Sequence, residues 1–98
     1  MTAYRYTPST PIEVVELLSA MFLRLPDHKL PIDDVDAGVD SAFKFLRECL
    51  GFIRSNLGDE RFLRALEMSH EAEEMYNQGN VRSGGFRLKD IQALIRKR

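Results

Sequence analysis

Apolar side chains recur at helical spacing through the longest patterned stretch of the chain, residues 32–57. Successive apolar positions are three or four residues apart, as on one side of an amphipathic helix, whereas a strand would alternate with a period of two. Aspartates at the start and Gly58 at the end suit the two termini of a helix. The pattern therefore predicts a helix over residues 33–57. Its apolar positions are Ile32, Val35, Val39, Ala42, Leu46, Cys49, Ile53 and Leu57.

The apolar arc of this central helix is wider than one neighbouring helix would cover. Phe43 and Leu50 lie on one flank of it, and Phe45 and Phe52 lie on the other. The arc therefore spans roughly 180°, compared with the roughly 100° that a single neighbour requires. We expect Phe45 and Phe52 to contact a partner or a second subunit, and hence a homodimer.

A helix near the start of the chain is indicated by signals at both of its ends. Thr10-Pro11-Ile12-Glu13 combines a capping box with proline at the first helical position. Pro26 interrupts the apolar pattern that follows, because proline disfavours helical backbone in the residue before it. We predict a helix over residues 11–25.

A third helix is expected after the central one. Asp59 is a good N-cap, and Gly79 with Asn80 ends the apolar pattern that follows it, which predicts a helix over residues 59–78. The fold class is thus all-α. We expect an antiparallel three-helix bundle at residues 11–78, with a short C-terminal amphipathic helix beyond it.

The segment before the bundle differs from it in pattern. Residues 1–10 are expected to form an extended arm, since Pro8 favours an extended path in the residue before it. Tyr4 and Tyr6 alternate with polar neighbours in this arm. The arm either drapes over the body of the molecule or uses its two tyrosines to anchor in a partner.

The segment after the bundle begins with the composition of a flexible linker, Gly-Asn-Val-Arg-Ser-Gly-Gly at residues 79–85. A basic amphipathic segment at 86–98 follows, with a helix expected over 87–97. A helix of this length is unstable alone and must dock on its own domain, a sister subunit or a partner. We expect its apolar side chains at such an interface: Phe86, Leu88, Ile91, Leu94 and Ile95.

Charge is distributed unevenly along the chain, although the net charge is only −1. Residues 1–78 hold eight Lys+Arg and fourteen Asp+Glu, a balance of −6, whereas residues 79–98 hold six Lys+Arg and one Asp, a balance of +5. The C-terminal segment is therefore a candidate basic patch. Its members are Arg82, Arg87, Lys89, Arg96 and Lys97.

Three interpretations of this basic segment compete. Clustered cations would neutralise the phosphates of a nucleic acid, but the acidic body would repel a duplex. A membrane-surface helix shares the basic amphipathic pattern, yet the chain lacks tryptophan. The third interpretation, which we favour, packs the helix in an apolar groove while its cations meet carboxylates such as Glu67, Glu71 and Glu74.

Catalytic and metal-binding chemistry finds little support in the residue pattern. Glu67-Met-Ser-His70 has the spacing of a carboxylate-bridged di-iron site, but the helical phase turns His70 toward water and the other ligands are lacking. No Ser–His–Asp set is recognisable, and Ser83-Gly-Gly85 lacks the spacing of a phosphate loop. We therefore expect neither an enzyme, nor a cofactor, nor a metal.

The cellular setting is inferred from cysteine use and hydropathy. The single cysteine, Cys49, cannot form an internal disulfide, and its place among apolar positions predicts a buried, unreactive thiol in a reducing compartment. The first residues lack the apolar core of a secretory signal, and no run approaches the length of a membrane span. We expect a cytoplasmic protein.

The function that best fits these features is a small regulatory protein-interaction module, of the anti-activator or adaptor type. It would bind a hydrophobic surface of another protein, for which a transcription regulator is one candidate. The alternative is a nucleic-acid-binding regulator that uses its basic C-terminal segment.

Overall fold

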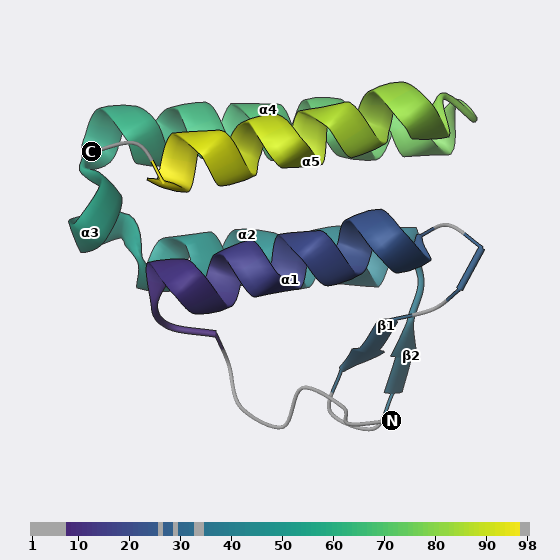
Figure 1. The fold of residues 1–98 in the computed structure, drawn as a ribbon, viewed down its shortest axis with the longest axis horizontal. Coiled ribbons are helices and arrows are strands. Elements are labelled where there is room, and N and C mark those ends of the chain that lie inside the picture. The colour runs from purple at the N-terminus through teal and green to yellow at the C-terminus, as the bar shows by residue number, and fades with distance from the viewer. Residues whose placement is uncertain (1–7, 26, 29, 33–34, 97–98) are drawn as a thin grey trace.

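The computed structural model of the chain describes residues 8–25, 27–28, 30–32 and 35–96, and helices dominate this part of the molecule (Figure 1). The prediction of a helical fold is confirmed. The described elements are α1 (Pro11–Arg24), β1 (Leu30–Ile32), β2 (Val35–Ala37), α2 (Val39–Phe52), α3 (Arg54–Leu57), α4 (Asp59–Asn77) and α5 (Val81–Arg96).

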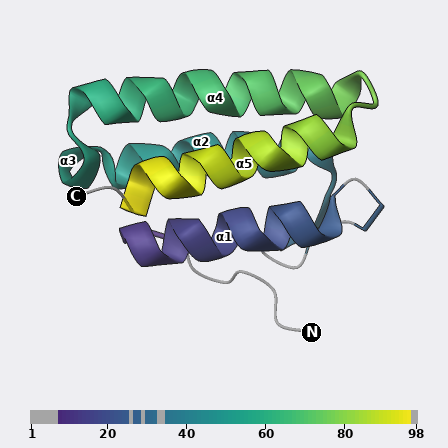
Figure 2. The same ribbon diagram turned by 45° about the horizontal axis from the view of Figure 1, so that its top comes forward.

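The four longer helices pack around one core in the order α1, α2, α4, α5, and α5 closes the ring by packing against α1. In Figure 1, α1 and α5 lie toward the viewer with α2 and α4 behind them, and neighbouring helices run in opposite directions. Figure 2 shows α5 between α4 and α1. The sequence predicts a short C-terminal helix added to a three-helix bundle. In the structure this helix is instead the fourth helix of the bundle and encloses the core together with the other three.

The core is built from the apolar stripes of all four helices. Phe43 of α2 packs against Tyr76 of α4, with the ring centroids 5.7 Å apart. Arg47 of α2 and Glu73 of α4 add a partly buried ion pair of 2.7 Å across the same two helices. Burying one large aliphatic side chain stabilises the fold by about 1.5–3 kcal/mol. The largest fully enclosed side chains are Phe43, Leu17, Leu18, Met21, Leu46, Leu50, Ile53, Leu88, Ile91, Val14 and Pro8.

The predicted start of the first helix is confirmed, and the helix ends at Arg24, one residue before the predicted end. The Thr10 Oγ1 atom accepts a hydrogen bond of 3.3 Å from the Glu13 backbone N–H, and the Thr10 hydroxyl donates one of 2.9 Å to Glu13 Oε1. Proline occupies the first helical position. The capping box thus satisfies a backbone N–H group that the first turn would leave without a partner.

The prediction of one helix over residues 33–57 is wrong at both ends. Residues 30–32 and 35–37 form an antiparallel strand pair in which Ile32 pairs with Val35, and α2 begins only after Gly38. β-Branched residues favour strands, and their three- and four-residue spacing here only imitates a helix. At the other end, Ile53 leaves the helical conformation and the chain continues as α3. Gly58, the predicted stop, has a φ of 81°.

The prediction of a flexible linker over residues 79–85 is also wrong. Gly79 makes the turn with a φ of 84°, and helix α5 begins at Val81. Gly84 and Gly85 are buried. A Cβ atom at Gly84 would lie 2.9 Å from Cδ2 of Tyr76, and one at Gly85 would lie 2.8 Å from Cε2 of Phe22. These two glycines therefore serve close helix packing and not flexibility.

Candidate interaction surface

Large apolar side chains remain exposed at five positions in the described part of the chain, and three of these belong to α1 and α5. Both helices lie on the same side of the molecule (Figure 1). We name their outward side the α1/α5 face and define it by Ile12, Glu16, Ser19 and Leu23 of α1 and by Arg82, Phe86, Lys89 and Arg96 of α5. The exposed fractions are 73% for Ile12, 77% for Leu23, 50% for Phe86, 58% for Phe52 and 59% for Leu63.

The contribution of α1 to this face is a straight stripe opposite its buried side. Ile12, Glu16, Ser19 and Leu23 follow one another at spacings of four, three and four residues, which places them on one side of a helix. Ile12 and Leu23 stand at the two ends of the stripe, about 16 Å apart at 1.5 Å per residue. The stripe therefore has two apolar ends and a polar middle.

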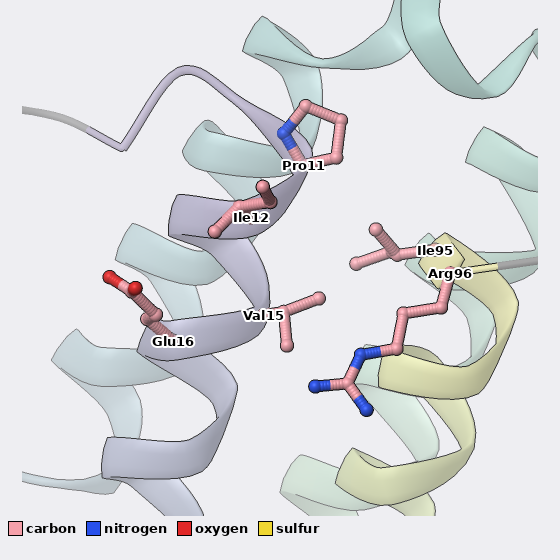
Figure 3. A pocket seen from close by; sticks show the side chains of 6 residues that line it. All are labelled: Pro11, Ile12, Val15, Glu16, Ile95 and Arg96. Carbon is pink, nitrogen blue, oxygen red and sulfur yellow. The ribbon is translucent and has the colours of Figure 1, made fainter.

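A groove lies between α1 and α5 at the Ile12 end of the face. It has a volume of about 470 Å³ and is open on one side. Figure 3 shows Val15 and Ile95 facing the space between the helices, with the Arg96 guanidinium beside Val15 and the Glu16 carboxylate directed away from it. The groove thus offers an apolar floor with a cation on one wall. Its lining residues are Pro11, Ile12, Val15, Glu16, Ile95 and Arg96.

The middle of the face is held together by one side chain. The Gln92 Nε2 atom donates to the Val15 carbonyl oxygen at 2.9 Å and to Ser19 Oγ at 2.8 Å. These bonds tie α5 to α1 and satisfy the amide of Gln92, which is partly buried. They keep the two halves of the face in a fixed relation.

Cations cover aromatic rings at the other end of the face. Lys89 Nζ lies 4.6 Å from the centroid of the Phe22 ring, and the Arg82 guanidinium carbon lies 5.7 Å from that of Phe86. Both distances are within the range of attraction between a cation and a ring face. Arg82, Lys89 and Arg96 stand against Glu16 alone, so the face carries a net charge of +2 from its defining residues.

The predicted basic patch is divided by the fold. Arg82, Lys89 and Arg96 belong to the α1/α5 face, whereas Arg87 turns toward α4. There the Arg87 guanidinium lies 3.3 Å from Asp90 and 4.0 Å from Glu71. The contact between Arg87 and Glu71 agrees with the favoured interpretation of the basic C-terminal segment, in which its cations meet carboxylates of the preceding helices. Lys97 lies outside the described residues.

Three of the predicted interface residues belong to the core of their own chain. Leu88, Ile91 and Ile95 are buried between α5 and its neighbours, and Leu94 is partly buried against them. The sequence predicts a partner or dimer interface for this stripe because it indicates only a short helix, and it leaves docking on the helix's own domain open. A helix of sixteen residues that closes the ring buries this stripe within one molecule.

The remaining predicted residues are scattered. Phe45 is partly buried against the core. Phe52 is exposed and lines a second groove of about 580 Å³ where α2, α3 and α4 meet. Tyr4 and Tyr6 lie outside the described residues.

The sequence reasoning did not identify Ile12 and Leu23 as interface residues. Both are apolar residues on the polar side of a predicted helix, a pattern that marks exposed apolar surface.

The buried thiol of Cys49 is poorly suited to chemistry. Burial, followed by the nearby charges of Glu48 and Glu13, raises the pKa of this thiol to about 12, so that the nucleophilic thiolate is scarce at neutral pH. Among the residues that the structure describes, no three His, Cys, Asp or Glu side chains are grouped as a metal site would require. None of the helices in these segments has the length and apolar character needed to cross a bilayer.

Comparisons with protein-family models, curated proteins and solved structures give no significant match to this chain.

Proposed function

We propose that the chain is a small protein-interaction module of the regulatory anti-activator or adaptor type, which binds a hydrophobic surface of another protein through its α1/α5 face. A transcription regulator is one candidate for that protein. Homodimerisation belongs to the same proposal, because a surface that accepts another protein can also accept a second copy.

The exposure of Ile12 and Leu23 is the observation that carries this proposal. Both are about three-quarters exposed on a helix whose opposite side is fully enclosed. Exposed apolar residues that are scattered singly need no explanation, but here Ile12 lines an apolar groove, and Leu23 and Phe86 belong to the same face. A protein interface combines apolar contacts with polar and charged ones, and this face offers both.

A nucleic-acid-binding regulator is the second candidate, and the outward position of Arg82, Lys89 and Arg96 supports it. Phosphate contacts from three cations would give a salt-dependent affinity. Two observations favour the protein partner over this candidate. Arg87 is engaged by carboxylates of its own chain. Arg82 and Lys89 also stand on either side of the exposed Phe86, whose ring gains nothing from phosphates.

Affinity capture with the full chain tests the proposal. The bait is incubated with an extract of cells that express it, and the protein that co-purifies is identified. We expect the double substitution Ile12→Ser with Leu23→Ser to abolish co-purification, because it removes the two largest apolar contacts of α1 on this face, and loss of such contacts commonly costs at least about tenfold in affinity. Duplex and single-stranded nucleic acid probes are titrated in parallel at low salt.

The matched control is Phe52→Ser, since Phe52 is also more than half exposed but belongs to α2. Circular dichroism verifies that each variant is folded. Retention of the same co-purifying protein by the Ile12 and Leu23 double variant would contradict the proposal. Binding of nucleic acid with affinity that falls upon Lys89→Glu, without a protein partner, would favour the second candidate.

A further inference from the structure

The outer side of α4 carries charges that mirror those of the α1/α5 face. Glu60, Glu67 and Glu74 follow one another at intervals of seven residues and are all exposed, on the side of α4 opposite the core. Three cations of the α1/α5 face have the same seven-residue spacing and are also exposed. They are Arg82, Lys89 and Arg96. Seven residues of α-helix span about 10 Å, so each set extends over about 21 Å.

From this correspondence we infer that the α1/α5 face of one copy binds the outer side of α4 of a second copy. The two helices would run parallel, so that Glu60 faces Arg82, Glu67 faces Lys89 and Glu74 faces Arg96. The inference extends the proposed function to the same face: self-association would cover the surface that binds another protein, and the two events would exclude each other.

The exposed apolar residues favour this parallel alignment over an antiparallel one. Leu63 lies three residues after Glu60, and Phe86 lies four residues after Arg82. With Glu60 opposite Arg82, Leu63 and Phe86 fall at the same level, and both are at least half exposed. In the antiparallel alignment Phe86 would instead lie opposite the polar stretch between Glu67 and Glu74. The parallel register therefore pairs apolar with apolar and acid with base.

The two surfaces cannot meet within one molecule. Arg61, near the start of α4, donates to the carbonyl oxygen of Leu94, near the end of α5, so these two helices are antiparallel in the fold. Leu63 and Phe86 consequently lie toward opposite ends of the bundle. Because the contact joins two different surfaces, each bound copy still offers one of them, and the assembly closes as a ring or extends as a chain.

The charges of the α4 surface are held weakly by their own chain. Glu67 pairs with Arg64, and Glu74 accepts a hydrogen bond of 3.3 Å from the Gln78 side chain. Exposed pairs of this kind contribute little to stability, at most about 1 kcal/mol. The carboxylates therefore stay available for cations of a second copy, and their attraction should be screened by salt, since the Debye length is about 8 Å at physiological ionic strength.

Sedimentation equilibrium of the full chain over a range of protein concentrations tests the inference. We expect the average mass to rise above that of one 11.3 kDa chain, to continue beyond two chains, and to fall with added salt. Glu67→Lys and Lys89→Glu should each weaken association about tenfold or more, because each places like charges opposite one another. The variant that carries both substitutions should associate like the wild type, since the exchange restores the pair.

Lys44→Glu is the matched control, because it changes the net charge as Lys89→Glu does but lies on the exposed side of α2. It should leave association unchanged. A second measurement uses Leu63→Cys with Phe86→Cys in a Cys49→Ala chain, in which mild oxidation should yield disulfide-linked oligomers through these two positions.

A chain that stays monomeric at millimolar concentration and low salt overturns the inference, as does failure of the double substitution to restore association. Association that Lys44→Glu weakens as strongly as Lys89→Glu also overturns it, because net charge would then be the cause. None of these results affects the capture experiment with the Ile12 and Leu23 variant, so binding of another protein is tested separately. A chain that stays monomeric would also remove the homodimer from the proposed function.

Discussion

Replacement of the glycines in helices by alanine separates two roles that glycine plays in this fold. Gly84 and Gly51 both lie within helices, Gly84 at the fourth residue of α5 and Gly51 at the next-to-last residue of α2, but their surroundings differ. A Cβ atom at Gly51 would meet nothing within 4 Å, whereas one at Gly84 would lie 2.9 Å from Tyr76 Cδ2 and 3.3 Å from the backbone oxygen of Ala72. The two substitutions therefore share their effect on helix propensity and differ only in packing.

The magnitudes follow from these distances. Alanine in place of glycine within a helix stabilises by about 0.5–1 kcal/mol, so we expect Gly51→Ala to raise the free energy of unfolding by that amount. Gly84→Ala has the same gain in helix propensity. Its methyl group, however, is forced against the buried Tyr76 ring and a backbone oxygen, and overpacking of this kind costs about 1–3 kcal/mol. We expect a net loss of about 1–2 kcal/mol for Gly84→Ala.

Gly85→Ala should fall between these two variants. Its Cβ atom would lie 2.8 Å from Cε2 of Phe22, a side chain that is only partly buried and can rotate toward solvent. Relief by rotation would carry the Phe22 ring away from Lys89 Nζ, so the loss should be smaller than for Gly84→Ala but not zero.

Urea denaturation followed by circular dichroism measures all three variants against the wild type. Thermal midpoints should agree, since about 1 kcal/mol shifts the midpoint of a domain of this size by roughly 4–8 °C. A Gly84→Ala variant as stable as Gly51→Ala would refute the reasoning, because it would show that α5 does not approach α4 as closely as the packing requires.

Two further predictions concern the thiol and the first helix cap. Because the pKa of Cys49 rises from 9.0 to about 12 on folding, the unfolded chain loses a proton that the folded chain keeps between these values. The free energy of unfolding should then fall by up to about 1.4 kcal/mol per pH unit as pH rises through this window, and less steeply in Cys49→Ala, as urea titrations at several pH values would show. Thr10→Ala should lower the free energy of unfolding by about 1 kcal/mol through loss of the cap, whereas Ser9→Ala, which keeps its backbone bond to Glu13, should change it little in the same assay.

Helix ends with a local chemical cause could be predicted from the sequence. The capping box at Thr10 and the glycine stop at Gly58 act through the backbone of a few neighbouring residues, so their effect is visible in a short window. The burial of Cys49 followed in the same way from its place among apolar positions. These features do not depend on which helices are neighbours.

Features that depend on distant neighbours could not be predicted in this way. Gly84 and Gly85 have the composition of a linker, and only the positions of Tyr76 and Phe22 show that they are packing contacts. The sequence likewise leaves open whether the apolar side of α5 packs on its own domain, a sister subunit or a partner, because nothing local shows that α1 would cover it. The α1/α5 face was missed for the same reason, since it is formed by two helices at opposite ends of the sequence.

Closure of the ring by α5 has a consequence during synthesis. The bonds from Gln92 to α1 join residues 77 and 73 positions apart, so the side of α1 that faces α5 is covered only after the last helix has been made. A ribosome that adds about 5–20 residues per second needs roughly four to fourteen seconds to make the 70 residues between Arg24 and Leu94. For that interval the part of α1 that α5 covers in the finished fold stays exposed to chaperones and proteases, and in a product cut short before Leu88 it should remain exposed.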